Sequence, residues 1–188
     1  RGVYAIFYAD ISLFTTILGF SINTAIIQYT ASNRLSFEKL LGLTVLFSFI
    51  TITLSIAILL VWLNLPISEL LFPNEYESWQ YIVWFILFLV ITQINTIYSS
   101  FLQGARKFNI VNRVLLVNSL LNLSLFGAAF TLHVCDIKKI GLFEILIIGL
   151  IIIVINSWQW HYHYKKTFHY RFSLKLQWKK EIRDFFHF

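Results

Sequence analysis

Long uncharged stretches alternate with short charged ones along the whole chain. Uncharged runs of 23, 29, 28, 22 and 20 residues lie between Asp10 and Arg34, Lys39 and Glu69, Glu77 and Arg106, Arg113 and Asp136, and Glu144 and Lys165. About 20 helical residues cross the ~30 Å hydrocarbon core of a bilayer, so each run is long enough for one span. A membrane β-barrel would show strands of about ten residues with alternating polarity, which residues 142–155 do not show. The pattern predicts an all-α membrane protein with five transmembrane helices.

The limits of these spans follow from the flanking residues. We expect spans at 3–29, 40–63, 79–101, 110–132 and 141–160, within a helical bundle that covers residues 1–164. Ser36 and Asn109 precede two of the spans and are expected N-caps. Trp and Tyr side chains gather at the expected span ends, as interfacial aromatic residues do; they are Trp79, Trp84, Trp158, Trp160, Tyr162 and Tyr164.

The composition agrees with lipid as the solvent of this chain. Hydrophobic residues make up 58% and charged residues 13%, against about 45–50% and about 25% in soluble domains. Cys135 is the one cysteine, so no disulfide forms within the chain. The sequence starts at Arg1 and contains no Met. We therefore expect a fragment of a longer polytopic membrane protein.

The basic residues predict the orientation in the membrane. Twelve of the 15 Lys and Arg residues lie on one side, in the loop after the first span, the loop after the third span and the segment after the fifth span. The positive-inside rule places that side in the cytoplasm. The chain then starts outside, and residues 165–188 form a basic, amphipathic cytoplasmic segment. Since topology and anionic lipid account for the net charge of +6, nucleic acid is not an expected partner.

Asp10 is the one acidic residue placed well inside an apolar span. At 100° per residue, Asp10, Ser21 and Gln28 lie within about 20° of one another, and Asn23 lies on roughly the opposite side. A carboxylate in a membrane usually faces a bundle interior or a water-filled cavity. Two hypotheses remain open: a proton- or cation-linked carboxylate on a transport cavity, or an interfacial carboxylate hydrogen-bonded to a neighbouring helix.

Two expected spans each carry a stripe of small polar residues at helical spacing. The first stripe is Thr44, Ser48, Thr51 and Ser55, and the second is Thr92, Thr96, Ser99 and Gln103. Such stripes either let helices approach closely or line a hydrated cavity. We favour packing for the first stripe, whereas the amides of Gln93 and Asn95 favour a cavity beside the second.

Further amides follow in the last two spans, with Asn118 and Asn122 one turn apart and Asn156 near the inner end of the fifth span. This recurrent neutral polarity suits a path for a neutral, hydroxyl-rich substrate such as a sugar, although buried amides also join helices in membranes. On the cytoplasmic side, Arg106, Lys107 and Arg113 either bind a phosphate or pyrophosphate headgroup, or signal topology and contact lipid.

Motifs of catalysis and metal binding are absent from the sequence. It contains no phosphate-binding Gly-rich loop, no HExxH, no GxSxG and no paired-cysteine site. His161 and His163 are two residues apart, so on a helix they point away from each other. We expect a transporter, not an enzyme, with no cofactor and no bound metal.

The landmarks resemble those of a known family, the polysaccharide and O-antigen flippases of the multidrug/oligosaccharidyl-lipid/polysaccharide exporter superfamily. Three segments carry the resemblance, and they read RGVYAIFYADISLFTTILGFSINTAIIQYTASNR, LQGARKFNIVN and FSLKLQWKKEIRDFFHF. They are similar to the second helix of these proteins, to the loop between helices four and five, and to the basic segment that joins two lobes.

The resemblance implies a partial N-terminal lobe of a two-lobed, MATE-like transporter. It implies transfer of a polyprenyl-pyrophosphate-linked oligosaccharide across the inner membrane of a bacterium by alternating access, with H⁺ or Na⁺ as the coupling ion and membrane lipids as further partners. The transport-cavity candidates are Asp10, Ser21, Asn23, Gln28, Gln93, Asn95, Asn118 and Asn122. The headgroup candidates are Arg106, Lys107 and Arg113.

Three other functions compete with this hypothesis. A drug or cation antiporter of the same superfamily would use intramembrane acids, for which this chain offers Asp10. A membrane-embedded enzyme would need a catalytic cluster at one membrane face, where His161 and His163 have no partners in the sequence. A non-transporting membrane subunit is the third alternative.

Overall fold

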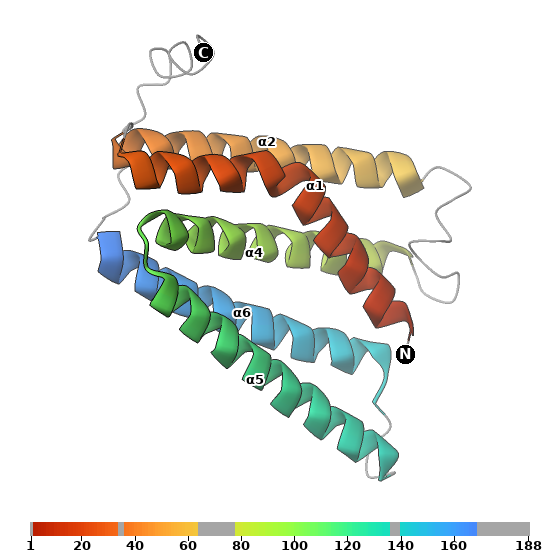
Figure 1. Ribbon diagram of the computed structural model, residues 1–188. Helices are drawn as coiled ribbons and strands as arrows, with labels where there is room; N and C mark the ends of the chain where they lie inside the picture. Colours follow the sequence, from red (N-terminus) through yellow and green to blue (C-terminus); the bar gives the residue numbers. More distant parts are fainter. Residues whose placement is uncertain (1, 34–35, 64–77, 136–139, 169–188) are drawn as a thin grey trace.

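The computed structural model describes residues 2–33, 36–63, 78–135 and 140–168; within the helices, the side chains of residues 2–8, 10, 17–21, 62–63, 78 and 80–81 are outside this description. The described residues form five α-helices and no strand (Figure 1). The helices are α1 (Gly2–Ser32), α2 (Phe37–Leu63), α4 (Ser78–Gly104), α5 (Phe108–Val134) and α6 (Leu142–Phe168).

The helices coincide with the five expected spans, with two corrections at their ends. The expected N-cap at Asn109 is wrong, because α5 begins at Phe108 and Lys107 takes the cap position without a side-chain hydrogen bond. α6 ends at Phe168, so the expected boundary between bundle and tail falls inside this helix. The remainder of the expected basic segment, residues 169–188, lies outside the described residues.

Four of the helices contain stretches that are long and apolar enough to cross a membrane. They are Phe37–Val61, Ile82–Gly104, Phe108–Val134 and Leu142–Phe168. α1 has 31 residues, and its status as a span stays a prediction because many of its side chains are outside the description. Large apolar side chains such as Phe49 (70% exposed) and Leu123 (73% exposed) cover the outside of α2 and α5. Surfaces of this kind contact lipid in a membrane protein. The chain is a multi-pass helical membrane protein.

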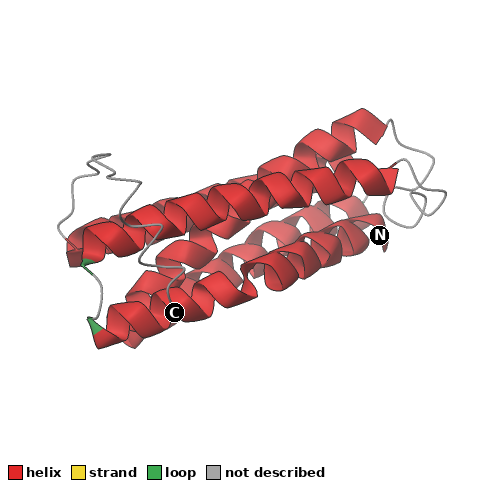
Figure 2. Cartoon of the chain, turned by 90° about the horizontal axis from the view of Figure 1, so that it is seen from above, coloured by secondary structure: helices red, strands yellow, loops and turns green. Residues whose placement is uncertain are grey.

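The helices run alternately up and down (Figures 1 and 2). The α1–α2 turn, the α4–α5 turn and the end of α6 therefore meet at one end of the bundle, which we call the basic end. Its described basic residues are Lys39, Arg106, Lys107, Arg113, Lys165 and Lys166. This grouping is the one that the sidedness of the charges predicted, while the orientation in a membrane stays a prediction.

α4 is the central helix, since it contacts each of the other four. α1 and α2 pack on one side of it, and α5 and α6 lie on the other (Figure 1). α1 and α4 approach each other closely at Gly104, where an added Cβ would lie 2.5 Å from Thr30 Cβ and 2.9 Å from the carbonyl oxygen of Ile27. Glycine is needed there because any side chain would push the two backbones apart.

Aromatic side chains fill the core near the basic end. Phe37 at the start of α2 stacks on Phe168 at the end of α6, with ring centroids 4.6 Å apart. Phe101 from α4 and Tyr164 from α6 complete this group, with centroids 5.6 Å apart. These contacts explain why α6 continues past the expected span end: Trp160, Tyr164 and Phe168 recur every four residues, and the first two are buried.

Candidate functional site

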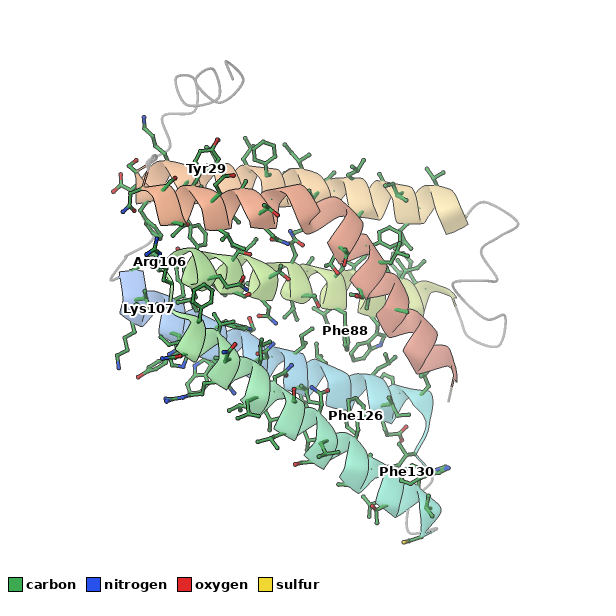
Figure 3. All side chains as sticks on the ribbon, viewed as in Figure 1. Tyr29, Phe88, Arg106, Lys107, Phe126 and Phe130 are labelled. Atoms are coloured by element: carbon green, nitrogen blue, oxygen red, sulfur yellow. The ribbon has the colours of Figure 1, made fainter. Side chains whose placement is uncertain are left out.

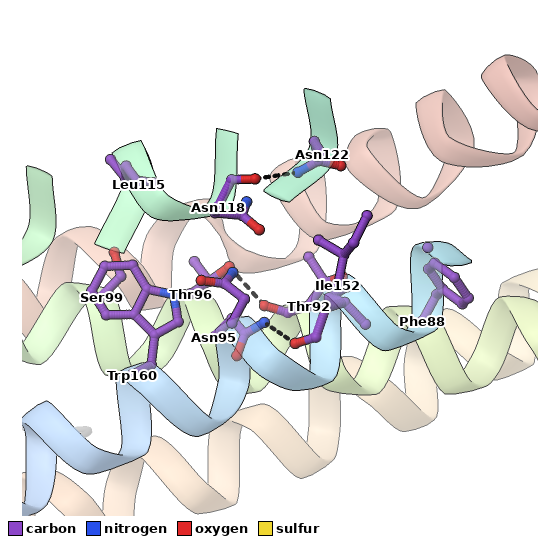
Figure 4. A pocket seen from close by; sticks show the side chains of 13 residues that line it. Phe88, Thr92, Asn95, Thr96, Ser99, Leu115, Asn118, Asn122, Ile152 and Trp160 are labelled. Carbon is purple, nitrogen blue, oxygen red and sulfur yellow. Dashed lines mark hydrogen bonds between the residues drawn. The ribbon is translucent and has the colours of Figure 1, made fainter. Parts of the chain in front are cut away.

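Three residues of the second polar stripe, Thr92, Thr96 and Ser99, line a partly open cavity between helices, whereas Gln103 does not reach it. The cavity has a volume of about 210 Å³ and lies between α4, α5 and α6 (Figure 4). Thr92, Asn95, Thr96 and Ser99 reach it from α4, because they fall on one face at 100° per residue. The other polar residues of its lining are Asn118 and Asn122 from α5 and Asn156 from α6. None of the described residues that line this cavity is charged.

Hydrogen bonds to backbone carbonyl groups fix the amides and hydroxyls of the cavity. Asn95 Nδ2 donates to the carbonyl oxygen of Ile153 on α6 at 3.5 Å, and Asn122 Nδ2 donates to the carbonyl oxygen of Asn118 at 2.8 Å (Figure 4). Thr96 Oγ1 donates to the carbonyl oxygen of Thr92 at 2.9 Å. Each of these two amides therefore uses one N–H on the backbone and keeps its second N–H, while Asn95 Oδ1 has no partner.

Four oxygen atoms of the cavity lining are buried without a hydrogen-bond partner. They are Thr92 Oγ1, Asn95 Oδ1, Asn118 Oδ1 and Asn156 Oδ1. More than nine tenths of buried polar groups in proteins are paired, and an unpaired one costs about 1–3 kcal/mol. The four unpaired oxygens are three amide acceptors and one hydroxyl that can also donate, and together they indicate a site for water or for a ligand with several hydrogen-bonding groups.

The first polar stripe has a different environment on α2. Thr44, Ser48 and Ser55 are buried, at 3%, 8% and 4% exposure. Each of their hydroxyls donates to a carbonyl oxygen four residues earlier in the same helix, at 2.6–2.7 Å. These side chains are satisfied within α2, and they permit close helix packing.

The remaining transport-cavity candidates are not brought together at this cavity. Gln93 is buried, but it lies about 160° around α4 from Asn95 and about 20° from Gly104, on the side that approaches α1. Asn23 Oδ1 on α1 is buried without a partner, and Gln28 is exposed. The side chains of Asp10 and Ser21 lie outside the described residues, so their roles stay predictions.

The three headgroup candidates lie at the basic end, all exposed (Figure 3). Arg106 follows the end of α4 with φ 58°, and its N–H donates to the carbonyl oxygen of Gln103 while the N–H of Lys107 donates to that of Leu102. This is a Schellman motif, in which glycine is the usual residue at the left-handed position. Arg113, on α5, lies within electrostatic reach of His163 on α6, as does Lys166.

Two aromatic residues of α6 correct the expectation of an interfacial role. Trp158 and Tyr162 are exposed, at 70% and 54%, as interfacial residues are, whereas Trp160 and Tyr164 are buried, at 2% and 8%. Trp160 lines the cavity beside Asn156. The sequence contained a signal for this position: Trp160 follows Asn156 by four residues, so the two side chains lie on the same face of a helix.

The neighbouring histidines show no metal-binding geometry. Nδ1 of His161 lies 3.1 Å from the hydroxyl oxygen of Tyr98, which joins α6 to α4. Among the described residues, no group of three or more His, Cys, Asp or Glu side chains is placed to hold a metal ion.

Comparison with protein-family models, with curated proteins and with solved structures gives no match to this chain. The helices alone therefore show a multi-pass helical membrane protein, and the resemblance to flippases stays a hypothesis.

Proposed function

We propose that this chain is part of a transporter that flips a lipid-linked oligosaccharide across the bacterial cytoplasmic membrane for polysaccharide or O-antigen biosynthesis. The observation that carries the proposal is the uncharged, amide-lined cavity between α4, α5 and α6. A glycan in the bilayer core loses its hydrogen bonds to water, at a cost of about 2–7 kcal/mol for each unpaired group. Amide and hydroxyl side chains inside the bundle replace those bonds, and their neutrality suits a neutral cargo.

The basic end has a separate role in this proposal. A polyprenyl pyrophosphate carries negative charge, and exposed Arg and Lys side chains at a membrane face attract anionic headgroups. Arg106, Lys107 and Arg113 are exposed at that end and are the candidate contacts for the pyrophosphate. The lipid tail stays in the bilayer while the glycan crosses by alternating access. Asp10 is the candidate for coupling transport to H⁺ or Na⁺.

A drug or cation antiporter is the second candidate, and one observation favours it. The rings of Phe88 and Trp160 line the cavity, as aromatic rings do where a cationic ligand binds. The lining has no acidic side chain among the described residues, however, and an acid would be the natural counter-ion for a cationic drug. The neutral lining therefore favours the glycan. A non-transporting membrane subunit would need no such cavity.

The test uses the complete gene product in a bacterial strain that lacks its own flippase. We expect restored surface polysaccharide, and loss of it in Asp10→Asn and in the double variant Arg106→Gln with Lys107→Gln. Lys39→Gln is the matched control, because Lys39 is an exposed cation of the same end, at the start of α2. Energy-dependent dye efflux without restored polysaccharide, for every lipid-linked glycan tried, would replace the flippase proposal with drug export.

A further inference from the structure

The cavity between α4, α5 and α6 is more specific than a general polar path. We propose that it is a binding subsite for one neutral sugar ring and that it excludes acidic sugars. This inference rests on the proposed function and specifies the class of sugar that the site accepts. Four features of the cavity support it: its unpaired acceptors, its lack of charge, its aromatic wall and its size.

The unpaired acceptors determine what the ligand must donate. Asn95 is 7% exposed, and its Nδ2 is engaged with the Ile153 carbonyl, so its Oδ1 remains without a partner. The amide oxygens of Asn118 and Asn156 and the hydroxyl oxygen of Thr92 are unpaired as well. These atoms come from three helices and surround one space (Figure 4). A ligand that carries several O–H donors around a ring satisfies them together.

The absence of charge determines what the ligand must lack. A carboxylate moved into a membrane interior needs a cation or several N–H donors to offset its desolvation. No Lys, Arg or His is among the described residues that line the cavity, and two of its amide nitrogens are engaged by backbone carbonyls. Neutral amide N–H groups, with no cation beside them, do not offset the desolvation of a full negative charge. A uronic acid is therefore excluded, whereas its neutral counterpart is accepted.

The wall and the size of the cavity limit the ligand further. Trp160 is 2% exposed and lines the cavity from α6, and Phe88 lines it from α4. An aromatic side chain offers a flat apolar surface for the C–H face of a sugar ring. Sites for drug-sized ligands have volumes of about 300–1,000 Å³. The volume here is about 210 Å³, so the site has room for one ring and not for an oligosaccharide.

Water is the competing occupant, and binding measurements separate the two. The probes are methyl β-D-glucopyranoside and the potassium salt of methyl β-D-glucopyranosiduronic acid, titrated into the purified chain in lipid nanodiscs, with saturation-transfer NMR as the readout. We expect the glucoside to bind with a roughly millimolar Kd, given the efficiency of small ligands, and the glucuronide to show no binding. Equal binding of both probes overturns the exclusion of acidic sugars. No binding of the glucoside overturns the subsite and leaves water as the occupant.

Variants on a single helix assign the binding to the cavity. Asn118→Leu removes an acceptor of the cavity, and Asn112→Leu changes an exposed amide of the same helix. We expect at least about tenfold weaker glucoside binding in the first variant, as for the loss of one buried hydrogen bond, and unchanged binding in the second. Equal binding in both variants places the sugar elsewhere and overturns the inference. If Asn118→Leu does not fold, the comparison of the two sugars on the wild-type chain still tests the proposal, because it needs no variant.

Sodium chloride is the third probe, because unpaired oxygens are also ligands for a cation. A sodium-dependent loss of glucoside binding would assign the oxygens to Na⁺ and overturn the sugar subsite. The proposed function fails in a different way. If the wild-type chain restores surface polysaccharide but binds no glucoside, the transport proposal stands and the subsite fails. If the chain binds the glucoside but does not restore surface polysaccharide in the deficient strain, the subsite stands and the transport proposal fails.

Discussion

The polar stripes of α2 and α4 have the same spacing in the sequence and different surroundings in the fold. On α2, the hydroxyls of Thr44 and Ser48 are buried, and each is bonded to its own helix. On α4, Thr92 and Thr96 line a cavity, and Thr92 Oγ1 has no partner. The two stripes differ in what surrounds them. α2 packs mainly against α1, while the α4 stripe borders a space that two other helices line with amides.

The comparison teaches that a hydroxyl stripe by itself does not define a site in a membrane protein. Ser and Thr hydroxyls donate to a backbone carbonyl oxygen of the preceding helical turn. They can therefore be buried on a packing face without an unpaired polar group. Asparagine differs, since its amide has two donors and an acceptor that one backbone carbonyl does not satisfy. The cavity is found where asparagines from several helices converge on a stripe, and not at the stripe alone.

The largest effect is expected on the face of α4 that packs on α1, away from the cavity. Gly104→Ala places a methyl group 2.5 Å from Thr30 Cβ, so the two helices must separate. Overpacking of this kind costs about 1–3 kcal/mol of unfolding free energy. Reversible unfolding in mixed micelles measures the change. The control is Gly127→Ala on α5, where nothing lies within 4 Å and helix propensity favours alanine. A Gly104→Ala variant as stable as this control would contradict the close packing of α1 and α4.

A smaller effect separates the two stripes directly. Ser48→Leu inserts a larger side chain into a buried position of α2, and we expect a loss of about 2 kcal/mol of unfolding free energy. Thr92→Leu inserts one beside a cavity of about 210 Å³, and we expect a change below about 0.5 kcal/mol, because the cavity accepts the side chain. The same unfolding assay compares them. Equal losses in the two variants would mean that both stripes are packing faces.

Much of this fold was predictable from sequence, because charged residues rarely enter the bilayer core. The uncharged runs placed all five helices within a few residues of their observed starts, and the charges indicated which turns meet at the basic end. The end of α6 was misjudged, because Tyr164 and Phe168 continue the helix by packing in the bundle and not by composition.

The cavity was predictable only in part. Asn95 and Gln93 are two residues apart in the same stretch of α4, and only their angular positions against neighbouring helices place the first at the cavity and the second beside α1. Trp160 is a tryptophan at the end of an expected span, which is typical of an interfacial residue. In the structure it is buried at the cavity, where three helices meet. Which helices converge is a property of tertiary packing, and a single sequence does not contain it in readable form.

A third effect, of the opposite sign, is expected where an asparagine faces the cavity. Asn118→Leu removes a buried acceptor that has no partner, so we expect a gain of about 1 kcal/mol in unfolding free energy. Under the proposed function, polysaccharide export should fall at the same time, since a residue that binds the ligand is not optimised for stability. Asn112→Leu, on the exposed side of α5, should change neither property. A variant Asn118→Leu that loses stability would show that this amide joins the helices.

The smallest effect tests whether the α2 stripe has any role beyond packing. Ser48→Ala removes a hydroxyl whose bond is to the Thr44 carbonyl at 2.6 Å, and that carbonyl is already part of the α2 hydrogen-bond ladder. Alanine fits the same space and is a better helix former, so the lost bond and the gained propensity nearly cancel. We expect a change in unfolding free energy within about 0.5 kcal/mol and unchanged polysaccharide export. Ser55→Ala provides the repeat at a second position, since its hydroxyl donates to the Thr51 carbonyl at 2.7 Å. If either variant reduced export at unchanged stability, the α2 hydroxyls would contact the cargo, and the two stripes would be parts of one transport path.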